Sequence, residues 1–181
     1  DSTLTKANFA GAILQDAILS NSILNEANFS DAKLYGVKLS GSTGNKAIFD
    51  RANLYSVDFE GGVFSKAHFI NSYMEGSNLQ DAKFDNANLS LANLSSSILS
   101  RADFTDADLS SANLENATMY NTILVRTNLS KAHLSGANLL RANAESAKFW
   151  GAIMNETSLS NINLYGADLT KAFMVSDDLR G

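Results

Sequence analysis

The chain has 181 residues, a net charge of −5 and an apolar content of 45%, so it can bury a substantial core. It contains no cysteine, which excludes disulfides and thiolate metal sites. Its mild acidity argues against electrostatic binding to nucleic acid or to an anionic membrane, and no stretch approaches the roughly 20 apolar residues of a membrane-spanning helix. We therefore expect neither direct nucleic-acid binding nor membrane insertion.

A five-residue repeat begins at Leu4 and continues in register to Leu179. Its central position holds Leu, Phe or Met in 34 of 36 repeats, and the residue two positions before the centre is Ala in 22 repeats and Ser or Thr in nine more. Asn or Asp stands directly before the centre sixteen times. Because no linker interrupts this register, the sequence predicts a single solenoid domain spanning residues 1–181.

A period of five fits neither regular secondary structure. On an α-helix a step of five rotates by about 140° net, so the centres would scatter around the axis. On a continuous strand an odd step sends successive centres to opposite faces. The centres can share one core only if the chain turns a corner once per repeat and coils around its own axis. The centre and the small residue two before it then face inward, and the other three residues face outward.

The phenylalanine residues indicate how many repeats complete one coil. Phe9, Phe29, Phe49 and Phe69 are spaced by 20 residues, and so are Phe64, Phe84 and Phe104. Stacked rings gain attraction beyond simple burial, so this spacing favours four sides and 20 residues per coil. The repeats then form nine coils, which at about 4.8 Å per coil give a rod roughly 43 Å long.

Four positions depart from the pattern. Ala144 replaces a central Leu, which leaves space for a bulkier neighbour or a small void. Gly44 also replaces a central Leu, and Gly62 occupies the small inner position. They indicate either a distorted coil edge or a local loop that contacts a partner. Asp177 places a carboxylate at an inner position near the end of the chain, which predicts a frayed last coil.

The tandem A-[N/D]-[L/F]-x-x pattern resembles the pentapeptide-repeat family. It is seen at residues 52–54, 87–89, 102–104 and 107–109. The resemblance covers essentially the whole chain and implies an all-β fold, a right-handed quadrilateral β-helix. Family members have varied roles, and the best understood bind DNA gyrase and confer quinolone resistance. Many are cyanobacterial and some occupy the thylakoid lumen. The chain begins with Asp1, which fits a cleaved precursor and an excised domain equally well, so cytoplasm, periplasm and thylakoid lumen all stay open.

The sequence predicts no catalytic, cofactor-binding or metal-binding residues, and therefore no enzyme. His68 and His133 both precede a centre, point outward and are 65 residues apart, so they should not share a metal or relay a proton. Asp and Asn before the centres recur with the fold, which makes them poor catalytic candidates.

The outward residues predict one candidate protein-binding face, made by residues 12–16 and their equivalents 20 apart. It carries Tyr35, Tyr55, Tyr73, Glu75 and Glu115. Four carboxylates against one lysine give this face a net charge of −3. Tyrosine is enriched at protein interfaces, but exposed tyrosines also stack between strands simply to stabilise a sheet. Both interpretations stay open.

A second candidate surface lies near the C-terminal end, where outward apolar residues accumulate. Exposed apolar groups at the end of a solenoid indicate end-to-end association, a missing cap or a continuing chain. The candidate self-association residues are Trp150, Ile153, Tyr165, Phe173 and Val175.

These features favour a non-enzymatic scaffold that presents a rigid surface to a protein partner. The alternative is a DNA mimic that binds and modulates a type II topoisomerase such as gyrase. The acidic face supports that alternative, whereas the mixing of Lys and Arg with acids elsewhere weakens it. Neither hypothesis requires a cofactor.

Overall fold

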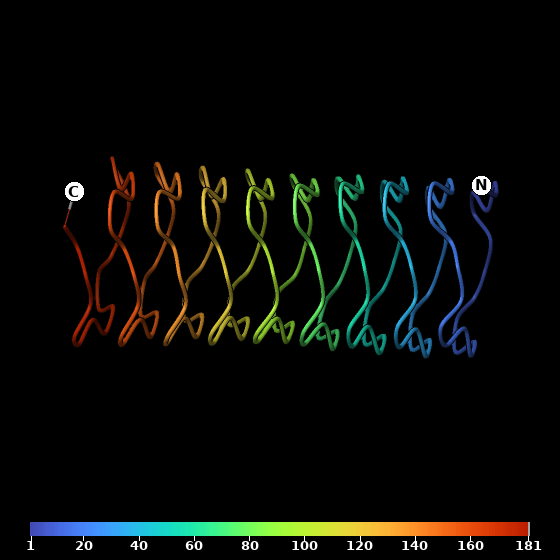
Figure 1. Cartoon of the computed structure of the whole chain (residues 1–181), viewed down its shortest axis with the longest axis horizontal. Coiled ribbons are helices and arrows are strands. Elements are labelled where there is room, and N and C mark those ends of the chain that lie inside the picture. Colours follow the sequence, from blue (N-terminus) through green and yellow to red (C-terminus); the bar gives the residue numbers. More distant parts are fainter. Residues whose placement is uncertain (181) are drawn as a thin grey trace.

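The computed structural model describes residues 1–180 and shows a rod of stacked coils with the two termini at opposite ends (Figure 1). Each bridging residue pairs in parallel with the residue 20 positions ahead, from Thr3 with Ile23 to Ser158 with Asp178. The bridges recur at every fifth residue, so each coil has four sides, and the predicted 20-residue coil is confirmed. Each side bridges through one residue only, and residues 1–180 contain no helix, hence none long and apolar enough to cross a membrane.

A tight turn after each centre makes the corner. In the first, the amide of Ala7 donates to the carbonyl of Leu4 at 3.0 Å, and Lys6 has a φ of +61°. A positive φ at the third residue of such a turn is the signature of type II geometry. It recurs at every fifth residue from Lys6 to Ser176, and only 8 of these 35 positions are glycine. Because a positive φ is unfavourable for other residues, stacking between coils must hold the corners in place.

Backbone hydrogen bonds join each side to the coil that follows. On the first side the amide of Leu4 donates to the carbonyl of Ile23 at 2.7 Å, and the amide of Ile23 donates back to Ser2 at 2.8 Å. The turn residue Lys6 adds a third bond, to Asn25 at 2.9 Å. Turn residues thus take part in the ladder together with the bridging residues, which satisfies corner amides that would otherwise need water.

The core is a column of centres lined by small residues. The rings of Phe9, Phe29, Phe49 and Phe69 stack with centroids 4.9, 4.8 and 4.8 Å apart. The second predicted column also stacks, since Phe64 and Phe84 lie 5.6 Å apart and Phe84 and Phe104 lie 5.3 Å apart. Centres and small inner residues of the middle coils are fully buried. The stacking distance matches the spacing of adjacent backbones, so ring and backbone geometry reinforce one another.

Gly44 and Gly62 make room for one aromatic ring. A Cβ atom on Gly44 would lie 2.6 Å from Cε1 of Phe64, and one on Gly62 would lie 2.6 Å from Cε2 of the same ring. The coil stays regular there, because the amide of Gly44 bonds the carbonyl of Val63 at 2.8 Å and Ala47 closes the usual turn at 3.1 Å. Both sequence interpretations, a distorted edge and a partner-binding loop, were therefore wrong. Both glycines make room for the ring of Phe64, Gly44 from the preceding coil and Gly62 from the same side of the same coil.

Ser and Thr at inner positions are buried but hydrogen-bonded. The hydroxyl of Ser77 donates to the carbonyl of Leu54 at 2.8 Å and accepts from the amide of Val57 at 3.1 Å. Thr127 donates to the carbonyl of Phe104 at 2.7 Å in the same way. A hydroxyl thus replaces the Ala methyl group without leaving an unpaired polar atom in the core.

The last coil departs from the pattern only at its final corner. Asp178 still bridges Ser158, but the turn bond expected from the amide of Asp177 to the carbonyl of Met174 is not formed within residues 1–180. One carboxylate oxygen of Asp177 accepts from the amide of Thr157 at 2.7 Å, while the other is buried without a partner. Burial raises the pKa of Asp177. The inner carboxylate predicted a frayed coil, and the structure confines its effect to this corner.

Candidate protein-interaction surface

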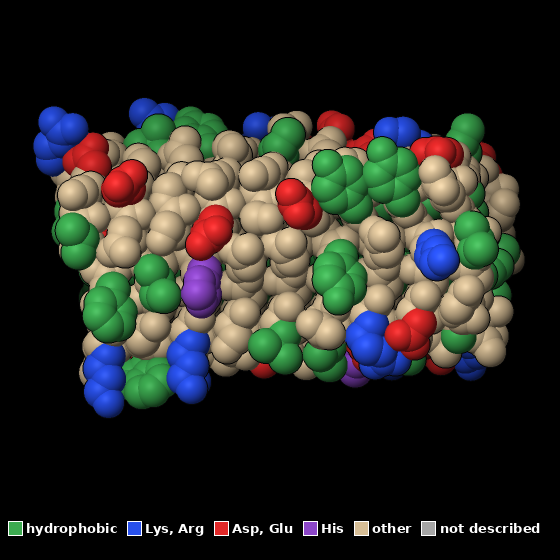
Figure 2. Space-filling view, turned by 90° about the horizontal axis from the view of Figure 1, so that it is seen from below, with side chains coloured by type: hydrophobic (Ala, Val, Ile, Leu, Met, Phe, Trp, Pro, Cys, Tyr) green, Lys and Arg blue, Asp and Glu red, His purple; other side chains and the backbone are tan. Residues whose placement is uncertain are grey.

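One long side of the rod and its two flanking corners carry all of the candidate residues except Tyr165. We call residues 12–16 and their equivalents up to 172–176 the tyrosine face. The chain enters it through the entry corner (residues 10–11 and equivalents up to 170–171). It leaves through the exit corner (residues 15–16 and equivalents up to 175–176). On the surface seen in Figure 2, hydrophobic side chains gather in separate groups with polar surface between them.

Two of the three predicted tyrosines form a stacked pair. Tyr35 and Tyr55 lie at the exit corner of adjacent coils, with ring centroids 5.5 Å apart and an interplanar angle of 8°. Each remains 42% exposed. Tyr73 lies one coil further on, at a bridging position between Asn53 and Asn93, and is 54% exposed. The structure therefore places all three on one surface, but only the first two contact each other as a stacked pair.

The predicted acidic residues lie beside these rings without cationic partners. Glu75 follows Tyr73 at the exit corner, and Glu115 occupies the same corner two coils further on. Within residues 1–180, neither carboxylate has a Lys or Arg nitrogen within 4 Å. Their charge is therefore available to a partner, in contrast with the acids described next.

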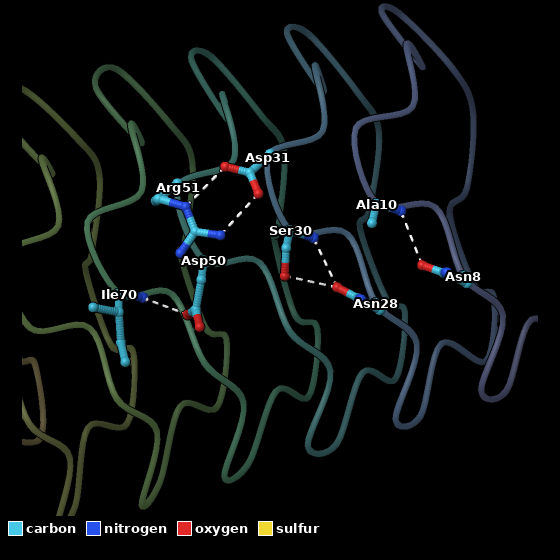
Figure 3. A network of polar contacts seen from close by, with 8 residues as sticks. All are labelled: Asn8, Ala10, Asn28, Ser30, Asp31, Asp50, Arg51 and Ile70. Atoms are coloured by element: carbon cyan, nitrogen blue, oxygen red, sulfur yellow. Dashed lines mark hydrogen bonds and ion pairs between the residues drawn. The ribbon is translucent and has the colours of Figure 1, made fainter.

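Other corners hold their carboxylates in pairs with arginine. Arg51 donates from Nε and Nη2 to both carboxylate oxygens of Asp31 at 2.8 Å, a bidentate pair across one coil step (Figure 3). These hydrogen bonds lower the pKa of Asp31. The same step joins Asp81 to Arg101 and Asp106 to Arg126. Such exposed pairs orient the corners and contribute little net stability.

The Asn and Asp residues before the centres have a structural role. Asn28 accepts from the amide of Ser30 at 2.9 Å, and Asn8 does the same for Ala10 (Figure 3). All sixteen Asn or Asp residues at this position make this bond to the amide two residues on. Where the position holds His68, Asp50 of the previous coil accepts from the amide of Ile70 instead, at 2.9 Å. The fold therefore accounts for the recurrence of these residues.

The two histidines lie on different sides of the rod, as predicted. His68 bridges Ile48 and Asn88, whereas His133 bridges Asn113 and Ile153 on the tyrosine face. In the part of the chain that the structure describes, no group of three His, Asp or Glu side chains could hold a metal ion.

The predicted C-terminal residues divide between several parts of the surface. Ile153 and Phe173 bridge each other on the tyrosine face, and Val175 lies at its exit corner. Trp150 lies at the entry corner, with the ammonium groups of Lys131 and Lys171 5.4 and 5.2 Å from its ring centroid. Because both lysines come from adjacent coils, they flank the indole and make this corner basic as well as aromatic. Tyr165 lies at a different corner, away from the other four.

The sequence interpretation missed two sets of exposed apolar side chains. Ile13, Ile18 and Ile23 surround the N-terminal end of the rod on three of its sides. Leu91 lies at the entry corner with a φ of +62° and is 58% exposed. The repeat itself held the signal for Leu91, because every other residue at the positive-φ position is glycine or polar.

The repeat pattern, the four-sided coil and the turn geometry agree with one family. A family model for pentapeptide repeats matches in 8 copies, over residues 2–41, 47–86, 87–124, 122–161 and 145–181. The chain belongs to the pentapeptide-repeat family. Its fold is the right-handed quadrilateral β-helix. Comparison with curated protein sequences finds no match.

Solved structures of pentapeptide-repeat proteins resemble the rod. A trypsin-treated variant of QnrB1, described as a plasmid-mediated fluoroquinolone resistance protein, is 20% identical with a TM-score of 0.61, covering 96% of this chain and 88% of that one. Full-length QnrB1 is 21% identical with a TM-score of 0.50, covering 96% and 91%. HetL from the cyanobacterium Nostoc, described as involved in heterocyst differentiation regulation, is 26% identical with a TM-score of 0.33, covering 93% and 89%. The likeness to QnrB1 establishes the fold and not an activity.

Proposed function

We propose that this pentapeptide-repeat protein is a non-enzymatic scaffold that binds a protein partner through the tyrosine face. Family members are generally structural or interaction modules. The observation that carries the proposal is the stacked and still exposed pair of Tyr35 and Tyr55, with Tyr73 on the next coil. Tyrosine supplies a large contact area while fixing only two side-chain torsions, which suits it to recognition.

The rod prepares this surface before any partner arrives. The backbone on either side of each tyrosine is fixed by hydrogen bonds to the next coil, such as the 2.7 Å bond from Leu54 to the carbonyl of Tyr73. A partner would therefore order few groups on binding, which lowers the entropic penalty of association. Stacking alone would account for the Tyr35–Tyr55 pair but not for Tyr73, which has no aromatic partner among the ring pairs of residues 1–180.

The test is quantitative affinity capture with matched variants. The triple variant Tyr35→Ala/Tyr55→Ala/Tyr73→Ala is compared with the wild type and with Ile123→Ala, which alters an exposed residue on the opposite side of the rod. We expect at least one protein to be retained by the wild type and Ile123→Ala and lost with the triple variant. Its purified form should then bind directly. Equal capture by all three forms would refute the proposal, provided that circular dichroism shows the triple variant to be folded.

A second candidate is modulation of a type II topoisomerase by an acidic surface. The unpaired Glu75 and Glu115, within a face of net charge −3, favour this candidate. A gyrase supercoiling assay with micromolar protein tests it. Inhibition or protection that disappears in Glu75→Gln/Glu115→Gln would support a topoisomerase partner, and no effect of the wild type would exclude that candidate.

End-to-end association through the C-terminal residues is a separate proposal. It is supported by Phe173 and Val175, which are 63% and 62% exposed. Sedimentation velocity over a range of concentrations should show a dimer that Phe173→Ser/Val175→Ser abolishes. A monomer at all concentrations would rule the association out.

A further inference from the structure

Leu91 is the one apolar residue among the 35 positions of positive φ. The other positions hold glycine or a polar or charged residue, so the repeat supplies 34 internal controls for what this position requires. A left-handed backbone is unfavourable for leucine, and Asn adopts it more readily. Leu91 stays 58% exposed, so burial compensates for this backbone only in part. Neither backbone geometry nor core packing therefore accounts for a leucine here.

The surroundings of Leu91 extend the proposed binding surface. From Leu91 the chain continues onto the tyrosine face at Asn93, which forms a β-bridge with Tyr73 of the preceding coil. The corner residue before it in the stack is Asn71, next to Ile70. Exposed and partly exposed apolar and aromatic residues thus occur from one corner of the tyrosine face to the other over four consecutive coils, with polar surface between them (Figure 2). They are Tyr35, Tyr55, Tyr73, Ile70 and Leu91.

We infer that Leu91 is a specificity-determining residue of this surface, and that its partner is a protein segment with an apolar side chain next to Lys or Arg. This inference rests on the proposed function and names the chemistry of the partner. The apolar side chain would cover Leu91 and Tyr73. The basic group would approach Glu75, which lies two residues beyond Tyr73 and has no cationic partner within residues 1–180. Charge complementarity thus favours a basic segment over an acidic one.

Stability and binding should change in opposite directions at this residue. Leu91→Asn places a residue better suited to positive φ at the corner, so we expect its melting temperature to be equal to that of the wild type or about 2 °C higher. Binding should nevertheless weaken about tenfold, because a leucine side chain is no longer buried against the partner. A residue that served the fold alone would show a lower melting temperature and unchanged binding.

The probe is a phage-displayed library of random dodecapeptides selected on the immobilised full chain. Enriched peptides should combine apolar residues with Lys or Arg, and their synthetic forms should bind Leu91→Asn about tenfold more weakly than the wild type. Leu91→Met should retain most of the affinity. Ser111→Asn, which places the same new residue at the equivalent position of the next coil, should leave it unchanged.

The outcomes separate this inference from the proposed function. Peptides that bind Leu91→Asn as tightly as the wild type, but are lost with the triple tyrosine variant, would overturn the role of Leu91 and leave the tyrosine face standing. Enrichment of acidic peptides would overturn the partner chemistry. No enrichment above an unrelated protein, or binding unaffected by either variant, would overturn both proposals.

Discussion

Replacing Gly44 with alanine should destabilise the rod. This result would be unusual, because alanine suits an ordinary backbone better than glycine does. The new Cβ would lie 2.6 Å from Cε1 and 2.7 Å from Cδ1 of Phe64, far inside van der Waals contact. Overpacking of this kind costs about 1–3 kcal/mol. The entropy that alanine removes from the unfolded chain offsets about 0.4–1 kcal/mol. We therefore expect Gly44→Ala to lower the free energy of unfolding by about 1–2 kcal/mol.

A second substitution, at Phe64, tests whether contact with its ring explains the destabilisation. Phe64→Leu removes the Cε atoms that Gly44 accommodates, but it also removes the stack with Phe84 and the edge contact with Phe59 at 5.1 Å. Alone it should destabilise by about 1–2 kcal/mol. In the double variant the new methyl group occupies space that the ring has left. The double variant should therefore lose about 1 kcal/mol less free energy of unfolding than the sum of the losses in the two single variants.

Chemical denaturation followed by far-ultraviolet circular dichroism measures all four members of this cycle. Because stacked repeats can unfold in parts, the slope against denaturant must be the same in each variant before free energies are compared. Additive effects to within about 0.5 kcal/mol would show that Gly44 does not serve the ring of Phe64, and the packing explanation would fall.

Three further changes test other parts of the structure. Thr127→Val should destabilise by about 1 kcal/mol in the same denaturation assay, because the buried carbonyl of Phe104 loses the donor that lies 2.7 Å away. Asp177→Asn should slow amide exchange in the last coil at pH 7 but not at pH 3. Burial raises the pKa of Asp177, so its penalty is absent below the unfolded-state pKa and grows as the pH rises. Asp178 behaves oppositely, since hydrogen bonds from Arg180 and Ser160 lower its pKa. Its contribution should be present at neutral pH and lost in acid, and Asp178→Asn should remove that pH dependence from amide exchange.

The fold could be predicted from the sequence because the core pattern repeats without a break. A period of five rules out helix and strand, and the Phe columns at 9, 29, 49 and 69 fix four sides per coil, as the 20-residue bridges confirm. Departures within the core were harder to interpret. The sequence alone indicates a distorted coil edge or a partner-binding loop at Gly44 and Gly62, whereas each makes room for the ring of Phe64. The sequence supplied this information too, since Gly44 and Phe64 are separated by one 20-residue coil.

The candidate surface was only partly predictable. Sorting outward residues by side brings Tyr35, Tyr55 and Tyr73 to one face, but periodicity alone cannot show that the first two stack while the third stays apart. Nor can it show that Lys131 and Lys171 flank Trp150, because that depends on side-chain torsions at the corner. Counting charged residues in the sequence gives the net charge of the face. It cannot show which carboxylates of the rod form ion pairs with arginine.

The repeat makes function easier to locate in this protein than in a globular domain. In an irregular fold, an unusual residue can always be attributed to its particular surroundings. Here all corners but the last share one backbone geometry, so a residue that differs from its equivalents can be explained by its neighbours in the stack or by a partner. Gly44 and Gly62 meet the first condition, through contact with a larger ring. Leu91 is 58% exposed at a corner of positive φ and borders the tyrosine face, which is why we propose that the second condition applies to it.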